Sequence, residues 1–600
     1  MKPILLFLLF ALAVLPVHGD DARLPALILQ YRADVDLLAR HTSNSGDSSA
    51  ALNRHRKLLN QWLKRVEALN FKGLSSEDQV DAVLLRNQIE KSIMQLDERK
   101  ETRKELAPWL PFYEVIDALG DARMLGGEMV PEEAAGTLAP VAISIKEMQG
   151  ALKAAKEKKE APASGGKRKP KLKPSVVLPT SHQALLASEA TDALAAQLRR
   201  WFENYDGFVP EFGWWMKQPH DAAAKALTDY SKYLREEIAG VKGKSKDEKG
   251  GSDGGEEELP LLGKVIGAQL LQRHLDHEFI PYTPQELIDL AEIEFAWCED
   301  QMRLAAKEMG LGDDWEKALQ RVKLQSMKPG EQETFVRAEA QRAIDFVKDR
   351  DLVSIPPNCE EWWGTRMLSL REQRNMPYAA YSGHDMLIAY ANEGMKHEDK
   401  MMSMRGNNRP FSRNVIPHEL IPGHHLQKYM AARERPYRGM FSTPFYVEGW
   451  ALYWEMRLFD LKYQPTPEDR IGALFWRMHR CARIIVTLKF HLGQMKPDEM
   501  VNFLTDRVGH EKFGATSEVR RFIKGDYSPL YQCGYLLGGI QLIALHKELV
   551  IEGGMAEKQF HDAILKLGPI PVELVRASLL KQPLESNFKT QWRFDESSSR

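Results

Sequence analysis

Residues 418–425 read His-Glu-Leu-Ile-Pro-Gly-His-His, and this stretch is the most informative part of the chain. It resembles the His-Glu-x-x-His signature of helical zinc sites, with Pro422 and Gly423 inserted before the second histidine. In that signature two histidines one helical turn apart bind zinc, and the glutamate between them activates a water molecule. We therefore expect Zn²⁺ as cofactor, with His418 as a metal ligand and Glu419 as the catalytic base.

The insertion changes the spacing of the two histidines. In an unbroken helix, His418 and His424 would lie about 240° apart around the axis and point in different directions. His425 returns to the same face but lies about 10 Å along the axis. Pro422 cannot donate a hydrogen bond to the carbonyl of His418, and Gly423 permits unusual torsions. The sequence therefore predicts a kink or bulge that makes His424 the second ligand, with His425 as the alternative.

An acidic third ligand is expected at Glu448, which follows His424 by 24 residues. Thr443 and Pro444 are typical of a helix start, so Glu448 would occupy the first or second turn of that helix. Glu455 lies on the same face of the helix, and we expect it to orient a ligating histidine. The alternative is that both acids face solvent or form ordinary ion pairs. Three protein ligands suffice for a catalytic zinc site, because one coordination position is kept for water.

The composition is that of a large folded protein. The 600 residues have a formal net charge of -2, 43% hydrophobic residues and thirteen tryptophans. This balance gives no reason to expect nucleic acid as a partner. The four cysteines include no Cys-x-x-Cys pair that could hold zinc. Buried thiols are the simplest interpretation, with a disulfide as the alternative.

The first 19 residues have the pattern of a secretory signal peptide. Lys2 is followed by an apolar run from Ile4 to Val17 and then by the small residue Gly19. The run is short for a membrane span, and no cysteine follows it to accept a lipid. We expect a periplasmic or secreted protein without stable membrane insertion after signal removal, and an uncleaved anchor is the alternative.

Helical periodicity prevails in the rest of the chain. Thr283 and Glu286 form a capping box, with proline between them at the first helical position, which predicts a helix over 283–310. Apolar residues that recur on one face predict further helices over 76–100 and from Thr466 onward. Strand-like alternation is scarce. We therefore predict a mostly α fold.

The chain is expected to divide near residue 260. A helical N-terminal region (20–260) would wrap onto a C-terminal catalytic region (261–600), with the active-site cleft between these helical halves. The segments 153–174 and 242–258 lack apolar residues to bury, so we expect them to form solvated, mobile loops. The first segment is strongly basic, but a surface insertion explains it better than nucleic-acid binding.

The motif at 418–424 resembles the hallmark of a bacterial family of exported proteins known as domain of unknown function 885. The hallmark is His-Glu-x-x-Pro-Gly-His, and the resemblance covers most of the chain, most specifically from about residue 410 to 580. The family is similar to gluzincin-type zinc metallopeptidases, which are helical and use a glutamate as third ligand. The resemblance therefore implies a metallopeptidase-like fold in which the helix over 445–455 supplies Glu448.

Two further family patterns are matched in part. Arg483 and His491 fit an Arg-x-x-x-Asp-x-x-x-His pattern, although Thr487 replaces its acid and Lys489 a glycine. A second segment matches at Pro529, Tyr535 and Gly538 and departs from the pattern at Leu530 and Tyr531. These departures leave the expected metal ligands intact and bear on substrate preference.

These positions suggest roles around the metal. Tyr535 or His491 could donate a hydrogen bond to the oxyanion of the reaction, and Arg483 could pair with a substrate carboxylate. The structural alternatives are that Tyr535 and His491 are core residues and that Arg483 belongs to an internal ion pair.

Together these features predict an exported zinc-dependent peptidase that acts on short peptides in a carboxypeptidase- or dipeptidase-like mode. Glu419 would accept a proton from water and pass it to the leaving amine. The alternatives are a zinc amidase acting on another amide, such as a cell-wall fragment, and a catalytically silent helical binding protein. Glu419 favours an enzyme, because a structural zinc site needs no adjacent base. The sequence does not indicate the oligomeric state.

Overall fold

The computed structural model describes residues 24–45, 48–160, 176–241, 260–373, 376–525 and 528–597. The predicted signal peptide and the predicted loop over 242–258 lie outside these residues. The loop predicted over 153–174 is wrong at its start, because residues 153–160 form the last two turns of a helix. Residues 161–174 of this prediction lie outside the described part of the chain. Alanines and alternating lysine and glutamate residues, all good helix formers, explain this extension.

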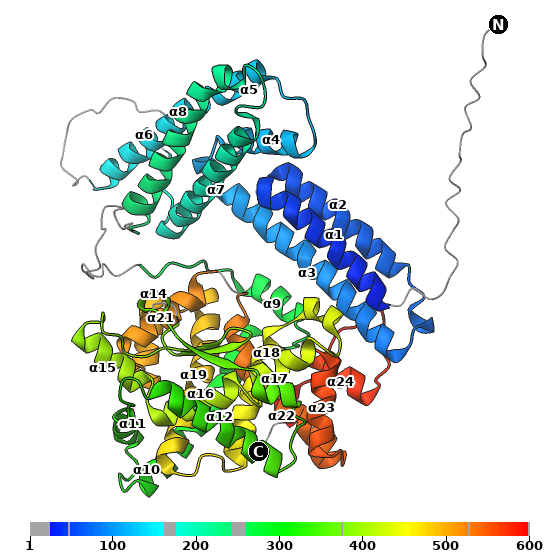
Figure 1. Cartoon of the computed structure of the whole chain (residues 1–600), viewed down its shortest axis with the longest axis vertical. Coiled ribbons are helices and arrows are strands. Elements are labelled where there is room, and N and C mark those ends of the chain that lie inside the picture. The colour runs from blue at the N-terminus through cyan, green and yellow to red at the C-terminus, as the bar shows by residue number, and fades with distance from the viewer. Residues whose placement is uncertain are drawn as a thin grey trace.

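The fold is mostly helical, as predicted (Figure 1). The N-terminal part consists of two bundles. The first contains α1 (Leu24–Ser45), α2 (Ser49–Glu67) and α3 (Ser76–Leu106). The second contains α4 (Tyr113–Met124), α5 (Pro131–Leu138), α6 (Val141–Glu160), α7 (Ser181–Tyr205) and α8 (Phe212–Tyr233).

A larger C-terminal body begins after residue 260 and lies below both bundles in Figure 1. Its first helices are α9 (Ala268–His277), α10 (Pro284–Glu308), α11 (Trp315–Lys323), α12 (Gln332–Asp349), α13 (Pro357–Glu361), α14 (Leu370–Gln373) and α15 (His397–Gly406). The helices of its centre are α16 (Arg409–Glu419), α17 (His424–Ala431), α18 (Pro444–Asp460) and α19 (Pro467–His491). The remaining ones are α20 (Pro497–Phe503), α21 (Lys512–Ile523), α22 (Tyr531–His546), α23 (Glu557–Leu567), α24 (Val572–Leu580) and α25 (Phe594–Ser597).

The C-terminal body also contains a small three-stranded sheet. Its strands are β1 (Gly364–Met367), β2 (Ala379–Tyr381) and β3 (Asp385–Ile388), in the order β1-β3-β2. β1 pairs with β3 in parallel and β2 pairs with β3 antiparallel.

Several helix starts confirm the sequence analysis. The Thr283 side chain accepts a hydrogen bond from the Glu286 amide and Glu286 returns one, which completes the capping box of α10. Thr466 caps α19 and Thr443 caps α18 through their side chains. α18 therefore begins where predicted, and Glu448 falls within its first two turns.

The hydrophobic cores do not follow a simple division into two halves. Buried residues of α4–α8 form a core of their own. Buried residues of α1–α3 instead share a core with the C-terminal body, including Trp450 of α18. A buried ion pair reinforces this connection, with Nε of Arg438 2.7 Å from Oδ1 of Asp81 on α3. The first bundle is thus part of the body that carries the motif.

One helical stretch of the described chain, Tyr531–Glu552, is long and apolar enough to cross a membrane by composition. It contains α22, and 72% of its most apolar window is buried inside the protein. It therefore serves as a core helix of the C-terminal body. The four cysteines are also buried, and all are free thiols.

Candidate metal centre

The inserted Pro422 and Gly423 break the motif helix into two. α16 ends at Glu419 and α17 begins at His424, so the expected kink is a full turn between helices. The Gly423 amide donates a 3.0 Å hydrogen bond to the Pro417 carbonyl. A Cβ on Gly423 would lie only 1.9 Å from the His418 carbonyl oxygen. Only glycine fits this close backbone approach, which brings the start of α17 back against the end of α16.

The turn is also fixed from α18. Trp450 is fully buried, and its indole Nε1 donates a 2.9 Å hydrogen bond to the Pro422 carbonyl. Gln427 of α17 donates from its side chain to the carbonyls of Tyr446 and Val447. These bonds hold the motif against the helix that carries Glu448.

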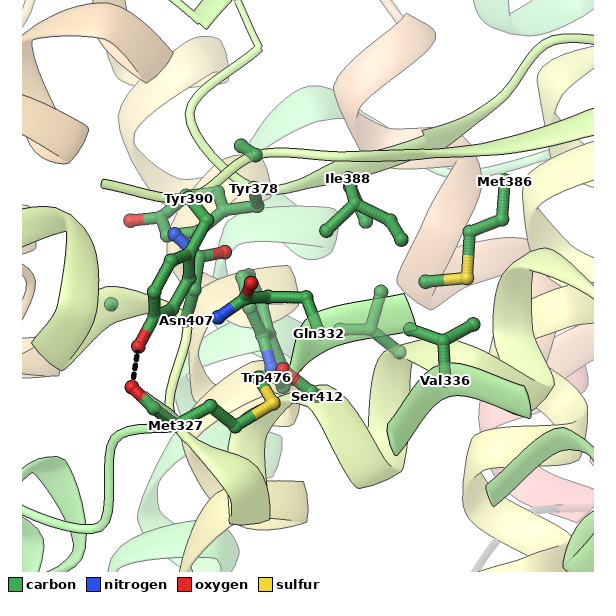
Figure 2. Close-up of a pocket in the computed structure, with 14 residues that line it drawn as sticks. Met327, Gln332, Val336, Tyr378, Met386, Ile388, Tyr390, Asn407, Ser412 and Trp476 are labelled. Carbon is green, nitrogen blue, oxygen red and sulfur yellow. Dashed lines mark hydrogen bonds between the residues drawn. The ribbon is translucent and has the colours of Figure 1, made fainter. Parts of the chain in front are cut away.

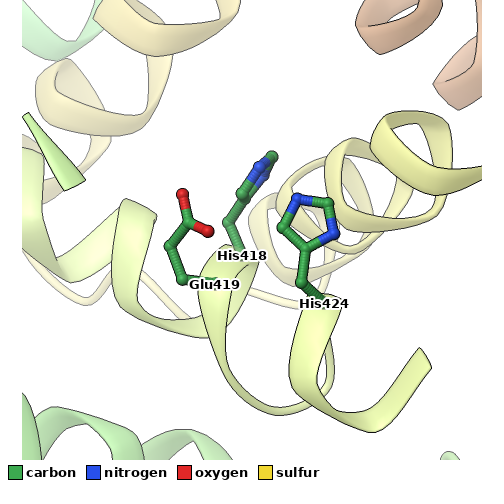
Figure 3. A group of neighbouring side chains, drawn as sticks. All are labelled: His418, Glu419 and His424. Carbon is green, nitrogen blue, oxygen red and sulfur yellow. The ribbon is translucent and has the colours of Figure 1, made fainter. Parts of the chain in front are cut away.

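The result is a compact cluster of His418, Glu419 and His424 (Figure 3). Each of the three side chains offers a ligand atom, and these atoms all lie within 4.8 Å of one another. The two imidazoles are nearly perpendicular, with ring centroids 4.8 Å apart. All three residues are buried.

Glu448 completes this cluster from α18. Its Oε2 lies 3.2 Å from Nε2 of His424 and 3.8 Å from Nε2 of His418. Zinc held at 2.0–2.1 Å by tetrahedral ligands would separate neighbouring ligand atoms by about 3.4 Å. The two imidazole nitrogens and one carboxylate oxygen therefore fit a divalent cation without large movement. Glu419 stands beside these three atoms, where a base is needed.

His425, the alternative ligand, points elsewhere. Its Nε2 donates a 2.8 Å hydrogen bond to the Cys359 carbonyl, and the Tyr381 hydroxyl donates a 2.8 Å bond to its Nδ1. Burial lowers the pKa of His425, which favours the neutral ring that these two bonds require. Both ring nitrogens are thus occupied, and His424 is the histidine that faces Glu448.

Glu448 is itself positioned by Tyr531 of α22. The Tyr531 hydroxyl donates a 2.5 Å hydrogen bond to Oε1 of Glu448, which leaves Oε2 facing the two histidines. α22 approaches α18 closely at glycines, because a Cβ on Gly538 would lie 1.9 Å from the Phe445 carbonyl oxygen. This close packing brings the Tyr531 hydroxyl within reach of Glu448.

Glu455 orients His418, as the sequence predicted for it. Its Oε1 lies 2.6 Å from Nδ1 of His418, so Nε2 of the same ring faces Glu448. Asn414 donates a 2.7 Å hydrogen bond to Oε2 of Glu455, and Arg480 donates a 3.3 Å bond to Oε1. A carboxylate behind a histidine is the usual arrangement around a metal ligand.

The electrostatics of the cluster favour a cation. Burial would raise the pKa of Glu448, but the neighbouring His424 and His418 rings outweigh it and hold that pKa well below its usual range. Burial would lower the pKa of His418, but hydrogen bonds to Glu448 and Glu455 raise it to about 9. A proton on His418 thus offsets negative charge of the buried Glu448 and Glu455 carboxylates. A bound metal ion would supply that positive charge instead.

Tyr535 lies next to the cluster, one helical turn after Tyr531. Its ring is nearly parallel to that of His418, with centroids 6.3 Å apart. The guanidinium groups of Arg480 and Arg483 lie 4.8 Å and 4.3 Å from the centre of the Tyr535 ring. The structure therefore shows Tyr535 as a stacking partner of a candidate ligand, while the hydroxyl that reaches Glu448 belongs to Tyr531.

Arg483 belongs to an internal network. Its Nη2 donates a 2.7 Å hydrogen bond to Glu518 and its Nε donates a 2.9 Å bond to His479. Both partners are completely or almost completely buried. The structure thus shows the internal ion pair that was the alternative for Arg483, and its pairing with a substrate carboxylate stays a prediction.

His491 does not join the cluster. It is the last residue of α19, and its Nδ1 donates a 3.2 Å hydrogen bond to the Lys264 carbonyl. It lies about 16 Å along the helix from Arg480, the residue of α19 that contacts Glu455. Its predicted role as an oxyanion donor is therefore wrong. The helix is too long for both ends to reach one site.

Tyr531, Asn414 and Arg480 are contacts of the cluster that the sequence patterns do not predict. A usable signal exists for Tyr531, because residues four apart share a face of a helix and Tyr535 is a predicted site residue. Asn414 precedes His418 by four residues, and the same rule places both side chains toward α18. No sequence pattern singled out Arg480.

A second feature near the motif is a small cavity between the sheet and α16 (Figure 2). Its volume is about 30 Å³, and its lining includes Tyr378, Met386, Ile388 and Trp476. The Tyr390 hydroxyl donates a hydrogen bond to the Met327 carbonyl at its edge. This space would hold one or two water molecules and is too small for a peptide.

Comparisons with known proteins place the chain in a group without an assigned activity. Residues 40–579 match the model of a family described as "Bacterial protein of unknown function (DUF885)". No curated protein matches the chain. Two similar solved structures show the fold only, since their sequence identities are 16% and 14%.

The first of these structures is described as "a putative lipoprotein of unknown function from Shewanella oneidensis". It aligns with a TM-score of 0.65 over 93% of this chain and 100% of its own. The second is described as "the putative lipoprotein from Colwellia psychrerythraea". It aligns with a TM-score of 0.57 over 94% of this chain and 99% of its own.

Proposed function

This chain belongs to the bacterial DUF885 family, and from its site we propose that it is an exported zinc-dependent peptidase acting on short peptides. One observation carries the proposal. Nε2 of His418, Nε2 of His424 and Oε2 of Glu448 converge at separations that suit one divalent cation, and the Glu419 carboxylate lies beside them. Nitrogen and carboxylate ligands in this number are typical of catalytic zinc.

The roles follow from position. Zinc, when bound by His418, His424 and Glu448, would polarise an amide carbonyl and acidify water. Glu419 has no role as a ligand in this arrangement and would accept the proton of the attacking water, then deliver it to the leaving amine. The Tyr531 hydroxyl donates to Oε1 of Glu448, so its role would be to hold this ligand with Oε2 toward the two histidines.

The proposed location outside the cytoplasm rests on two observations. The first 19 residues have the composition of a signal peptide, and each of the two similar structures is described as a "putative lipoprotein". This chain has no cysteine near residue 19 to accept a lipid, so we propose a periplasmic or secreted protein.

Short peptides are the proposed substrates, cleaved in a carboxypeptidase- or dipeptidase-like mode. A set of peptides of two to ten residues, each with a free or an amidated C-terminus, would define this mode. Cleavage confined to peptides with a free C-terminus is the expected result. Equal cleavage of free and amidated peptides would contradict the carboxypeptidase-like mode, but it would not contradict the peptidase activity itself.

The mechanism is tested with Glu419→Gln in the zinc-loaded protein. The variant keeps the ligands but loses the base, so we expect about one bound zinc per chain and a loss of hydrolysis of about 10²- to 10⁴-fold. Glu434→Gln, which changes an exposed carboxylate in the loop after α17, should leave both properties unchanged.

Three results would contradict the proposal in different ways. Undiminished hydrolysis by Glu419→Gln would contradict the role of Glu419 as the base. A zinc-loaded wild-type protein that cleaves no peptide would favour the amidase or the silent binding protein. If the protein binds no zinc at all, the proposed metal centre at His418, His424 and Glu448 is contradicted.

A further inference from the structure

Two buried cysteines lie at the interface of α10 and α19, apart from the residues of the metal centre. Cys298 belongs to α10 and Cys481 to α19, and these two helices pack against each other. Neither cysteine is exposed to solvent, and both belong to one hydrophobic core of the C-terminal body. The two thiols therefore share an apolar interface between two long helices.

Ion pairs between the two helices define how they are aligned. Arg470, near the start of α19, contacts Glu308, the last residue of α10. Near the other end of α19, Nζ of Lys489 lies 3.8 Å from Oε1 of Glu292, which belongs to the first half of α10. The helices are therefore antiparallel.

This alignment places the two cysteines at the same level. Cys298 lies ten residues before Glu308, and Cys481 lies eleven residues after Arg470. At a rise of about 1.5 Å per residue, these separations differ by only about 1.5 Å along the helices. Cys298 and Cys481 are thus opposite each other.

The surroundings of the thiols agree with this placement. Nε of Arg477 donates a 2.5 Å hydrogen bond to Oε1 of Glu294, and these residues lie one turn before Cys481 and Cys298. Burial, together with a hydrogen bond to the Cys298 thiol, raises the pKa of the Cys481 thiol well above its usual value. The two thiols are therefore in direct contact.

The arrangement fits the dimensions of a disulfide. Packed helices lie about 8–10 Å apart, and their Cα atoms lie about 2.3 Å from each axis. Facing residues consequently have Cα atoms about 3.5–5.5 Å apart, a range that overlaps the separation of about 4.4–6.8 Å found across disulfides. Facing cysteines on α10 and α19 can be joined while the helices stay packed.

We propose that Cys298 and Cys481 form a modification site, at which a disulfide joins α10 to α19 in the exported protein. Each thiol gives up one proton and one electron as the S–S bond forms. An external disulfide, in a small molecule or a protein, takes up both protons and both electrons and becomes two thiols. Such oxidants act outside the cytoplasm, so the proposal rests on the proposed export but is independent of the peptidase activity.

The bond would form while the chain folds. In the folded protein both thiols are closed off from solvent, and the raised pKa of Cys481 keeps its reactive thiolate form scarce. An exported chain meets its oxidant before α10 and α19 close on each other. A chain that folds in the cytoplasm instead buries both groups as thiols.

The test compares the mature chain, residues 20–600, produced in two compartments of a bacterial host. One sample is exported to the periplasm behind a leader of the host, and the other is retained in the cytoplasm without a leader. N-ethylmaleimide labels all free thiols of the denatured chains, and mass spectrometry counts the labels. Of the four cysteines, we expect two labelled in the exported chain and four in the cytoplasmic chain. Peptide mapping without reductant should find Cys298 joined to Cys481.

Single substitutions identify the pair. Exported Cys298→Ala should carry three labels, because Cys481 has lost its partner. Cys359→Ala and Cys533→Ala are the matched controls, since they remove buried thiols outside the pair and should each leave one label. The host leader and the thiol count make these results independent of the predicted signal peptide and of peptidase activity.

Thermal unfolding provides a second measurement. The disulfide links residues more than 180 positions apart and restricts the unfolded chain, so the exported wild type should unfold at a higher temperature than the cytoplasmic one. Cys298→Ala should unfold at the same temperature from either compartment. Four labels on the exported wild type, or a disulfide that includes Cys359 or Cys533, would overturn the proposal. One label on exported Cys298→Ala would overturn it as well, because another pair would then account for the bond.

Discussion

His418 lies between the carboxylates of Glu448 and Glu455, and Glu455 determines the orientation of its ring. Glu455 faces Nδ1 at 2.6 Å and is itself fixed by Asn414 and Arg480. This leaves Nε2 of His418 directed at Oε2 of Glu448. The ligand geometry is thus determined by residues that would never touch the metal.

Glu455→Gln is expected to lower zinc affinity without abolishing it. An amide holds the imidazole less strongly than a carboxylate, and loss of such a supporting group typically costs 10- to 100-fold in metal affinity. Competition with a chromophoric chelator would measure this change. Glu434→Gln should show wild-type affinity, and an equal effect in both variants would contradict the role of Glu455.

The two tyrosines of α22 can be distinguished by removing one hydroxyl at a time. Tyr531→Phe should lower kcat by about 10- to 100-fold, because the hydrogen bond that orients Glu448 is lost. Tyr535→Phe keeps the ring that stacks on His418 and should reduce kcat much less. Steady-state kinetics on a cleaved peptide would compare them. A larger loss for Tyr535→Phe would restore the prediction made from sequence.

At this scale the sequence predicted the residues of the cluster but not all of their neighbours. Motif spacing identified His418, Glu419, His424 and Glu448, since the chemistry of a metal site restricts both residue type and distance along the chain. The sequence pattern pointed to Tyr535 and not to Tyr531, although both lie on one face of α22. Only the packing of that helix against α18 shows which hydroxyl reaches Glu448.

The approach of α18 and α22 depends on glycines in their shared face. A Cβ on Gly538 would lie 1.9 Å from the Phe445 carbonyl oxygen and 2.8 Å from the Gly449 Cα. These neighbours are backbone atoms and cannot turn aside. The helices can therefore approach closely only while these positions lack side chains.

Gly538→Ala is expected to separate the two helices and destabilise the fold by about 1–3 kcal/mol, the usual cost of overpacking, or by more. Zinc affinity should fall as well, because Glu448 and Tyr531 lie on these helices. Gly539→Ala is the matched control, since its Cβ would meet flexible side-chain atoms of Leu452 and Met456 at 3.3 Å. Denaturant unfolding compares the two, and equal stability would contradict the close packing.

At the scale of elements, helix starts were more predictable than helix interruptions. Capping residues such as Thr283 and Thr466 act locally, so their patterns were sufficient. The break after Glu419 was expected only as a kink. Its extent depends on the hydrogen bond from Trp450 to Pro422, which joins segments that are distant in sequence.

Several histidines of the whole molecule are buried as neutral rings. Burial lowers the pKa of His491 and His561 to about 4 and that of His510 to about 3. Unfolded histidines titrate near 6.5, so the unfolded chain binds more protons than the folded one between these values. The stability that these rings contribute is present above pH 6.5 and is lost as the pH falls toward 4.

His561→Gln should reduce this acid sensitivity. A pKa lowered from 6.5 to about 4 corresponds to about 3 kcal/mol of stability lost over that range. The free energy of unfolding of the variant should therefore fall less between pH 7 and pH 4 than that of the wild type, as measured by urea titration. His397→Gln changes an exposed ring and should retain the wild-type slope. An unchanged slope in His561→Gln would contradict the buried neutral state.

The architecture of the whole chain was predictable in class but not in detail. Helical periodicity correctly indicated a mostly α protein. The sharing of one core by α1–α3 and the C-terminal body could not be derived, because it depends on contacts such as Asp81 with Arg438, over 350 residues apart in sequence. Local patterns carry no information about such pairings.

The most direct test of the proposed metal centre is X-ray diffraction at the zinc absorption edge from crystals of the zinc-loaded protein. We predict one strong anomalous peak, about 2 Å from Nε2 of His418, Nε2 of His424 and an oxygen of Glu448. His425 should remain bonded to the Cys359 carbonyl. A peak coordinated by His425, or no peak among these three side chains, would contradict the proposed metal centre.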